Sequence, residues 1–347
     1  MKAAVYLEPG RIEVADLPEP RIREDELLVK VRAASICGTD LRISKHGHFK
    51  IPAGQRRVLG HEVAGDVVAA GPGVAAFAVG DRVTVTPNIG CGRCAMCRAG
   101  ENSMCPDYEA FGISLDGGFE EYLRVPSFAL GRGNVFRIPD GVDYPEAALT
   151  EPFSCCYRGQ RLLRVGFEDV VLVMGAGPIG TFHLLLAKLA GARKVIVSDL
   201  APARLEAARR SGADVVVDVS SADLAEAVLA ETDGRGADVI VTAVSSAAVQ
   251  AQAVQLLATT GRVNFFAGLG AGGTVEIDTN RVHYKGLTLT GTTGSSNADY
   301  LASLRLVGDR RVDLRPLVTG TFPLERIHEA MEHAASGAGM KATIRFD

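Results

Sequence analysis

The first 150 residues of the chain carry short apolar runs that are broken by glycine and proline. Valine-rich segments such as "KAAVYL", "ELLVKVRAA" and "GDRVTVTP" follow one another closely, with turn residues between them. Short strands at close spacing with turns between them are typical of barrels and sandwiches built only from strands. The pattern therefore predicts a compact β-barrel or sandwich in this part of the chain.

From about residue 165 the pattern changes to strands that alternate with helices. "EDVVLVMGAG" predicts a buried strand, "PIGTFHLLLAKLAG" an apolar helix that ends at Gly191, and "KVIVSD" the next strand. Further strands are predicted at "DVVVDV", "ADVIVTAV", "GRVNFFAG" and "GLTLTGTT". Strands with helical connections in this number indicate a doubly wound parallel sheet.

The last stretch of the chain contains two predicted helices, "ADYLASLRLVGD" and "LERIHEAMEHAASG", and a final strand, "KATIRF". It is too short to bury a core of its own, so we expect it to return and pack on the first part. At about 150 residues per domain, a chain of 347 residues suggests two domains. The sequence thus predicts an α/β protein with a first domain over residues 1–153, a second over 154–294, and a returning C-terminal segment over 295–347.

Charge and composition exclude several classes of partner. The formal net charge of −4 leaves no basic footprint for nucleic acid or for an anionic membrane. No apolar run approaches the roughly 20 residues that a membrane span needs, and the first residues, "MKAAVYLEPG", lack the apolar core of a signal peptide. We therefore expect a cytoplasmic protein whose partner is a small molecule.

Four of the seven cysteines lie in one loop, "GCGRCAMCRAGENSMC". Cys91, Cys94 and Cys97 follow a CxxCxxC spacing, and Cys105 follows later in the same loop. Four thiolates complete the tetrahedral coordination of Zn²⁺ and leave no open position for water or substrate. The loop is therefore predicted to bind a structural zinc ion, with an iron–sulfur cluster as the alternative. A DNA-binding zinc finger would need a basic helix after the loop, which this chain lacks.

The stretch "VMGAGPIG" places Gly175, Gly177 and Gly180 in GxGxxG spacing between a predicted strand and a predicted helix. In a dinucleotide-binding fold these glycines make the tight turn, let the backbone approach the pyrophosphate and let the helix pack close to the strand. Pro178 and Ile179 open the helix, whose N-terminal N–H groups are suited to bind phosphate. We predict that these residues bind a nicotinamide dinucleotide.

Asp199 ends the next predicted strand, at the offset of about 20 residues where such a fold has an acidic residue. A carboxylate there accepts hydrogen bonds from a ribose 2′-hydroxyl and repels a 2′-phosphate, which favours NAD over NADP. Arg204 either lies near the ribose, where it would accept a phosphate, or belongs to a solvated helix face with Arg209 and Arg210. A glycine-rich turn beside a surface aspartate is the structural alternative for the whole motif.

Four further residues are candidate ligands of a second zinc ion. Cys37 lies in "SICGTD", His61 and Glu62 lie in "VLGHEVAG", and Glu151 lies in "LTEPFSCC". Three protein ligands from thiolate, imidazole and carboxylate groups, with water in the fourth position, define a catalytic zinc site. The spacing alone does not decide, because lone residues of these types also occur in cores and on surfaces. The two cysteines that follow Glu151 are interpreted as packing residues.

Several motifs taken together resemble one enzyme family. "ICGTD", "GHEVAGDVVAAGPGV", the four-cysteine loop and "VMGAGPIG" stand in the order found in the zinc-containing medium-chain alcohol and polyol dehydrogenases, and the resemblance covers nearly the whole chain. "HE" and "EPF" are similar to the sorbitol and threonine dehydrogenase branch. The ethanol-using branch has a cysteine where Glu151 stands.

The resemblance implies a GroES-like catalytic barrel formed by the start and the end of the chain, together with a Rossmann domain. It implies a catalytic zinc ion held by Cys37, His61 and a glutamate, either Glu62 or Glu151, in addition to the structural zinc. It also implies NAD as the cofactor and a homodimer or homotetramer, for which "GRVNFFAGLGAGGTVEI" would supply a sheet edge.

The activity implied by the family is the oxidation of a secondary alcohol to a ketone, in which the hydroxyl proton is lost at the zinc site and hydride passes to NAD. Thr39 is expected to relay the proton, with a turn-capping role as the alternative. Asp40 is expected to support the local turn or a zinc ligand. Relatives often have a histidine directly after this motif, which this chain lacks; His46 and His48 are either substitutes in the relay or ordinary surface residues.

The expected substrate is a polyol, sugar or cyclitol, because a glutamate near the zinc makes the site more polar than a cysteine would. The sorbitol enzymes carry an Arg–Tyr pair where this chain has Gly294 and Ser295, which argues against sorbitol itself. The 3-hydroxyl of L-threonine and a vicinal diol such as butanediol are the alternative substrates. Two alternatives belong to other classes: a dehydrogenase-like protein that has lost its activity and serves as a binding protein, and a zinc-free quinone reductase. Neither requires the full set of candidate zinc ligands.

Overall fold

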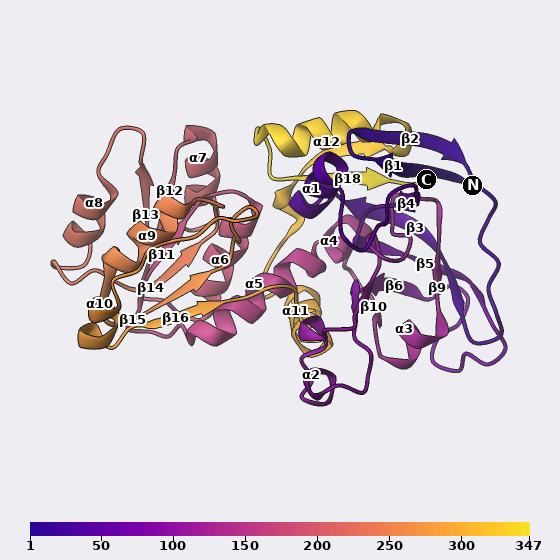
Figure 1. Cartoon of the computed structure of the whole chain (residues 1–347), viewed down its shortest axis with the longest axis horizontal. Coiled ribbons are helices and arrows are strands. Elements are labelled where there is room, and N and C mark those ends of the chain that lie inside the picture. The colour runs from indigo at the N-terminus through magenta and orange to yellow at the C-terminus, as the bar shows by residue number, and fades with distance from the viewer. The chain divides into compact units, whose positions relative to one another are not determined.

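The computed structural model describes all 347 residues, which form two compact units. The first unit contains Met1–Ser154 and Gly294–Asp347, and the second contains Cys155–Thr293. Figure 1 shows the helices and strands of each unit, most of them labelled. None of the helices combines the length and the apolar character that crossing a membrane requires.

Short strands dominate the first unit, as the apolar runs predict. They are β1 (Lys2–Glu8), β2 (Arg11–Asp16), β3 (Leu27–Ser35), β4 (Arg57–Val58), β5 (Glu62–Ala70), β6 (Arg82–Val85), β7 (Asn88–Ile89), β8 (Glu109–Ala110), β9 (Tyr122–Val125), β10 (Val135–Arg137), β17 (Val318–Pro323) and β18 (Lys341–Arg345). The helices are α1 (Gly38–His46), α2 (Ala95–Arg98), α3 (Ser127–Gly131), α4 (Tyr144–Ala148), α11 (Asn297–Gly308) and α12 (Ile327–Ser336), with short 3₁₀ helices at Asn102–Met104, Arg315–Leu317 and Leu324–Arg326.

Three sheets organise these strands. The largest has the order β10–β6–β5–β3–β18–β17, with β9 also paired to β3; the others are β2–β1–β4 and β7–β8. β18 pairs antiparallel with β3 through Thr343 and Ser35, so the C-terminal segment adds its strands to a sheet that the N-terminal segment begins. Valines of β3, β5 and β6 meet Ile327, Ala330 and Met331 of α12 in one apolar core.

The second unit alternates strands and helices. Its strands are β11 (Val170–Met174), β12 (Lys194–Asp199), β13 (Val215–Asp218), β14 (Ala237–Thr242), β15 (Leu257–Phe265) and β16 (Thr288–Gly291). Its helices are α6 (Pro178–Leu189), α7 (Pro202–Arg210), α8 (Leu224–Ala230), α9 (Ala247–Leu256) and α10 (Thr279–Lys285), together with most of α5 (Thr150–Leu163).

These strands form one sheet in the order β13–β12–β11–β14–β15–β16, and every pairing is parallel. The order reverses between β11 and β14, which is the switch point where doubly wound folds bind ligands. Alternate residues of β11 face two separate cores. Leu172 packs with apolar residues of α8, α9 and α10, whereas Val171 and Val173 pack with residues of α5, α6 and α7. The predicted doubly wound sheet is therefore confirmed.

One detail of the prediction is wrong. The segment "GRVNFFAGLGAGGTVEI" was expected to supply a free sheet edge, but β15 lies between β14 and β16, and the residues after Phe265 form no strand before α10. The edge strand on that side is the short β16. The strand β16 itself was predicted, at "GLTLTGTT", but the sequence pattern does not show the order in which strands pair, so its place at the edge of the sheet was missed.

Candidate metal centres and dinucleotide site

The pairing of β3 with β5 brings the first group of candidate ligands together. Ser35 on β3 is opposite Glu62 on β5, so Cys37, just beyond β3, lies near His61, just before β5. The thiol, imidazole and carboxylate ligand atoms of Cys37, His61 and Glu62 all lie within 4.8 Å of one another. Residues 24 positions apart in the sequence thus meet because two strands run antiparallel in this register.

Asp40 connects the two segments that carry these ligands. Its carboxylate accepts hydrogen bonds from the backbone N–H of Cys37 at 2.9 Å and of Gly60 at 3.3 Å, and it lies 3.1 Å from Nδ1 of His61. Burial lowers the pKa of His61, but the charges of Asp40 and Cys37 outweigh it and raise that pKa well above its ordinary value. A carboxylate on Nδ1 leaves Nε2 for a metal ion and fixes the ring, as in carboxylate–histidine–zinc arrangements.

Glu62 has one satisfied oxygen and one orphaned oxygen. Its Oε1 accepts a hydrogen bond from the ammonium group of Lys341 at 2.7 Å, and the same ammonium group donates to the carbonyl of Ile36 at 2.7 Å. Burial raises the pKa of the Glu62 carboxyl, and the charge of Lys341 opposes that shift. Oε2 is buried without any hydrogen-bond partner. A buried carboxylate oxygen that lacks a donor, beside a thiol and an imidazole, fits a cation bound among the three side chains.

Lys341 is a residue of this centre that the sequence analysis missed. It is the first residue of β18 and is only 5% exposed. Lysine is almost never fully buried unless it is paired. The lysine that opens the apolar strand "KATIRF" was therefore the available signal, but its partner Glu62 is 279 residues away in the sequence.

The remaining predicted residues of this centre lie nearby in sequence or fold but outside the group of three. Thr39 is half-buried in the first turn of α1. Glu151 is 5% exposed in the first turn of α5, and its carboxylate is not among the clustered ligand atoms. His46 is exposed at the end of α1, and His48 stacks on Phe49. Ser295 is fully buried, and its hydroxyl accepts a hydrogen bond from the hydroxyl of Ser154.

The four cysteines of the loop form the second group of candidate ligands. The sulfur atoms of Cys91, Cys94, Cys97 and Cys105 lie within 4.8 Å of one another, and none is in a disulfide. Backbone N–H groups of Cys91, Cys94 and Cys97 donate to sulfur atoms of the same group at 3.2–3.4 Å. Backbone donors from Arg93 and Cys94 lower the pKa of Cys91 to about 6, whereas burial raises the pKa of Cys97 to about 12. The donor set fits a zinc ion with four sulfur ligands.

The glycine turn after β11 has the geometry of a dinucleotide-binding turn. Gly175 has a φ of +109°, which an L-residue rarely adopts, and a Cβ atom on Gly180 would lie 1.7 Å from the carbonyl oxygen of Gly175. The first turn of α6 can therefore approach β11 only with glycine at both positions. Gly177 caps α6 without a side-chain hydrogen bond, and Pro178 and Ile179 follow in its first turn, so backbone N–H groups there have no side-chain cap.

Asp199 lies beside this turn at the end of β12. Its carboxylate accepts hydrogen bonds from the backbone N–H groups of Ala176 at 2.7 Å and Ala201 at 2.9 Å. The guanidinium group of Arg204 lies 4.0 Å from Asp199, and a Cβ atom on Gly177 would lie 3.9 Å from it. Arg204 thus lies over the glycine turn, apart from the exposed face that Arg209 and Arg210 share with Glu206.

Comparison with known proteins identifies the family. Residues 23–139 match the alcohol dehydrogenase GroES-like domain, and residues 178–309 match the zinc-binding dehydrogenase family. The chain is 34% identical to the sorbitol dehydrogenase of Bacillus subtilis (strain 168) over 336 residues, which cover 96% of this chain and 93% of that protein. It belongs to the zinc-containing medium-chain dehydrogenases.

Other relatives of this dehydrogenase carry different substrate names. The L-threonine 3-dehydrogenase of Shewanella woodyi is 32% identical, with both chains fully covered. A zinc-binding dehydrogenase of Sinorhizobium meliloti 1021, solved with NADP, has a TM-score of 0.92 at 32% identity and 99% coverage of both chains. The 2R,3R-butanediol dehydrogenase of Bacillus subtilis has a TM-score of 0.89 at 28% identity, covering 100% of this chain and 99% of that one.

Several predictions from the sequence are thereby confirmed: the superfamily, the GroES-like and Rossmann folds, a zinc-dependent alcohol dehydrogenase as the enzyme class, and zinc with NAD(P) as its cofactors. The chain is thus an enzyme. The alternatives of an inactive dehydrogenase-like binding protein and of a zinc-free quinone reductase are not supported. The enzyme's substrate and its preference between NAD and NADP are not fixed by these relatives.

Proposed function

We propose that this dehydrogenase oxidises a secondary alcohol of a polyol, sugar or cyclitol to the ketone, with NAD⁺ as the hydride acceptor. One observation carries the proposal: Cys37, His61 and Glu62 present three different zinc-ligand types within 4.8 Å, and a buried oxygen of Glu62 has no other partner. Three protein ligands are the number that leaves a coordination position for a substrate oxygen.

Each residue of the centre has a proposed role. Cys37, His61 and Glu62 hold the zinc ion, Glu151 is the alternative carboxylate ligand, and Asp40 fixes the ring of His61. When bound, the zinc ion supplies a positive charge that makes a hydroxyl group easier to deprotonate. Thr39 passes the released proton from the substrate hydroxyl toward solvent, while the carbinol hydrogen leaves as hydride to the nicotinamide.

In the second unit, the glycine turn holds the pyrophosphate of the cofactor. Gly175, Gly177 and Gly180 let the backbone approach, and Pro178 with Ile179 begins the helix whose N–H groups face the phosphates. We infer that Asp199, which accepts a hydrogen bond from Ala176 of this turn, also accepts one from the ribose 2′-hydroxyl, and this favours NAD. Arg204 beside it is the one feature that would tolerate a 2′-phosphate. We propose NAD as the preferred cofactor because the carboxylate of Asp199 directly contacts the turn.

A substrate panel tests the proposal. Polyols, cyclitols, L-threonine and 2,3-butanediol are each offered with NAD⁺ and with NADP⁺, and reduced cofactor is followed by absorbance. We expect the highest kcat/KM with a polyol or cyclitol and NAD⁺. Highest activity with L-threonine or butanediol would place the enzyme with its threonine- or butanediol-named relatives instead. Preference for NADP⁺ would show that Arg204 rather than Asp199 decides the cofactor.

A further inference from the structure

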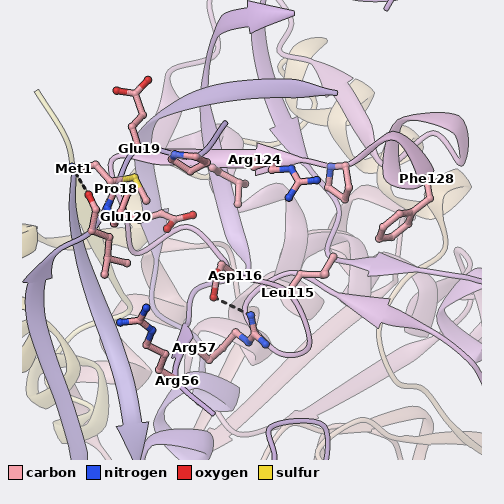
Figure 2. Close-up of a pocket in the computed structure, with 14 residues that line it drawn as sticks. Met1, Pro18, Glu19, Arg56, Arg57, Leu115, Asp116, Glu120, Arg124 and Phe128 are labelled. Carbon is pink, nitrogen blue, oxygen red and sulfur yellow. Dashed lines mark hydrogen bonds and ion pairs between the residues drawn. The ribbon is translucent and has the colours of Figure 1, made fainter. Parts of the chain in front are cut away.

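A pocket of about 540 Å³ lies in the first unit, and none of the candidate zinc ligands lines it. Its volume is within the range of small-molecule sites, roughly 300–1,000 Å³. More of its wall is apolar than polar, and the apolar residues include Leu17, Pro18, Leu115, Leu123 and Phe128. Figure 2 labels Pro18, Leu115 and Phe128 among them. Charged residues also line it, namely Glu19, Arg56, Arg57, Asp116, Glu120 and Arg124. Sites for small organic ligands combine an apolar wall with polar groups that orient the ligand.

Glu120 is the polar group that points into this pocket without a partner. It follows the core residue Phe119 in a segment that lies beside β1, where it forms a bridge with Ala3. Its side chain is only 3% exposed, and no hydrogen bond or ion pair is made by its carboxyl group. Figure 2 shows this carboxyl group directed into the space between Met1 and the pair formed by Arg57 and Asp116.

The other charged groups around the pocket are already engaged or exposed. Arg57 donates to Asp116 at 2.9 Å, and Arg124 forms two hydrogen bonds with the buried carboxylate of Glu26. The terminal ammonium group of Met1 donates to the carbonyl of Leu17 at 2.8 Å. Arg56 and Glu19 are exposed at the rim. No cation of the chain is therefore paired with Glu120.

We propose that this pocket binds a small organic cation, an amine with an apolar body, whose ammonium group pairs with the carboxylate of Glu120. The apolar wall accepts the hydrocarbon part, and the ammonium group supplies the hydrogen-bond donors and the positive charge that the buried carboxyl group lacks. An anionic ligand is less favoured, because Arg57 and Arg124 already pair with Asp116 and Glu26; the buried Nε of Arg57, which has no hydrogen-bond partner, remains available to a neutral acceptor on the ligand. The site is independent of the proposed alcohol oxidation.

Protonation gives the site a distinctive signature. Burial, and to a smaller extent the charge of Asp116, raises the pKa of Glu120 to about 9, while Arg57 lowers it only partly. The carboxyl group is therefore protonated in the empty pocket at pH 7 and must lose its proton to pair with an ammonium ion. Binding an amine should release about one proton at pH 7, and the affinity should rise by up to about tenfold per pH unit toward pH 9.

Isothermal titration calorimetry of the full-length protein with n-hexylammonium tests the proposal. Titration in buffers with different ionisation enthalpies measures the proton release, and neutral hexanamide is the matched probe without charge. We expect one n-hexylammonium per chain bound at this pocket, with proton release, and weaker binding of hexanamide.

Two variants distinguish binding in this pocket from binding at the proposed zinc centre, because an amine nitrogen can also coordinate a zinc ion. Glu120→Gln keeps the shape of the side chain but removes the charge, and it should weaken n-hexylammonium binding by roughly tenfold or more and abolish the proton release. Leu115→Trp, which fills the pocket without altering Glu120, should also weaken binding. Equal affinity of the wild-type, Glu120→Gln and Leu115→Trp proteins would overturn the proposal, as would equal affinity for hexanamide.

Discussion

Buried carboxyl groups of the first unit differ in what surrounds them. Asp40 accepts two backbone hydrogen bonds and faces His61, Glu62 is paired with Lys341, and Glu120 has no partner. The motifs around Asp40 and Glu62 marked them as candidates in the sequence, whereas nothing in the segment "GGFEEYL" marks Glu120. Their roles follow from contacts made by residues distant in the chain.

Replacement of Lys341 by methionine should destabilise the protein strongly. The side chains of Lys341 and Glu62 are 6% and 0% exposed, and removing one partner leaves an uncompensated buried charge. Breaking a buried pair typically costs about 3–5 kcal/mol in the free energy of unfolding. Denaturant unfolding of Lys341→Met measures this cost.

The matched control is Lys2→Met, because Lys2 pairs with Glu325 where both side chains are about half exposed. An exposed ion pair is worth at most about 1 kcal/mol. A loss for Lys341→Met no larger than that for Lys2→Met would contradict the ion pair described here.

Glu120→Gln should alter how stability depends on pH. The carboxyl group has an ordinary pKa of 4.5 when unfolded and about 9 when folded, so the folded state holds a proton that the unfolded state loses. Stability of the wild type should therefore fall as the pH rises from about 5 to 9, by up to about 1.4 kcal/mol per pH unit from this group. The variant lacks this group, so its unfolding temperature should exceed that of the wild type near pH 9 and match it near pH 5. Parallel pH profiles for the two proteins would show that Glu120 is not buried in this way.

Thr39→Val should lower turnover while leaving the affinity for NAD⁺ unchanged. A positioned proton-transfer group contributes about 10²–10⁴-fold to the rate, and valine has the shape of threonine without the hydroxyl. Steady-state kinetics with the best substrate of the panel measures kcat and the KM for NAD⁺. Thr39→Ser, which keeps the hydroxyl, should retain most of the turnover; if Thr39→Val retains it as well, the residue only caps the turn of α1.

At the scale of single elements, the turn between β11 and α6 shows why a short motif can be read from sequence. Gly175 needs its positive φ, and Gly180 needs the absence of a Cβ atom that would lie 1.7 Å from a carbonyl oxygen. Both requirements arise within six residues of chain, so the motif, its strand and its helix were predicted together. By contrast, the order in which strands pair has no such local signal, so the edge of the sheet was misplaced although β16 itself was predicted as a strand.

Gly180→Ala should disrupt this turn selectively. The added Cβ atom forces α6 away from β11. The backbone N–H groups of α6 that are proposed to bind the pyrophosphate move with the helix, so the Kd for NAD⁺ should rise at least about tenfold. Gly166→Ala is the control, because a Cβ atom there meets nothing within 4 Å. Fluorescence titration with NADH measures both. Wild-type affinity in Gly180→Ala would mean that the turn does not carry the cofactor.

At the scale of the whole molecule, local patterns predicted most of the fold, and long-range pairing determined most of the site. The alternation of strands and helices in the second unit, the four-cysteine loop and the ligand types at Cys37, His61 and Glu62 were all visible in the sequence. The burial of Lys341 against Glu62, and of Glu120 beside β1, was not visible, because the partners in each case are far apart in the sequence.

The zinc content of the purified protein and of its Cys37→Ser variant decides whether the chain has an open metal centre beside the four-cysteine loop. The two groups of candidate ligands predict two zinc ions per wild-type chain and one per Cys37→Ser chain, with activity lost in the variant. A single zinc ion in the wild type that is unaffected by Cys37→Ser and lost in Cys97→Ser would contradict the assignment of Cys37, His61 and Glu62 as a zinc site.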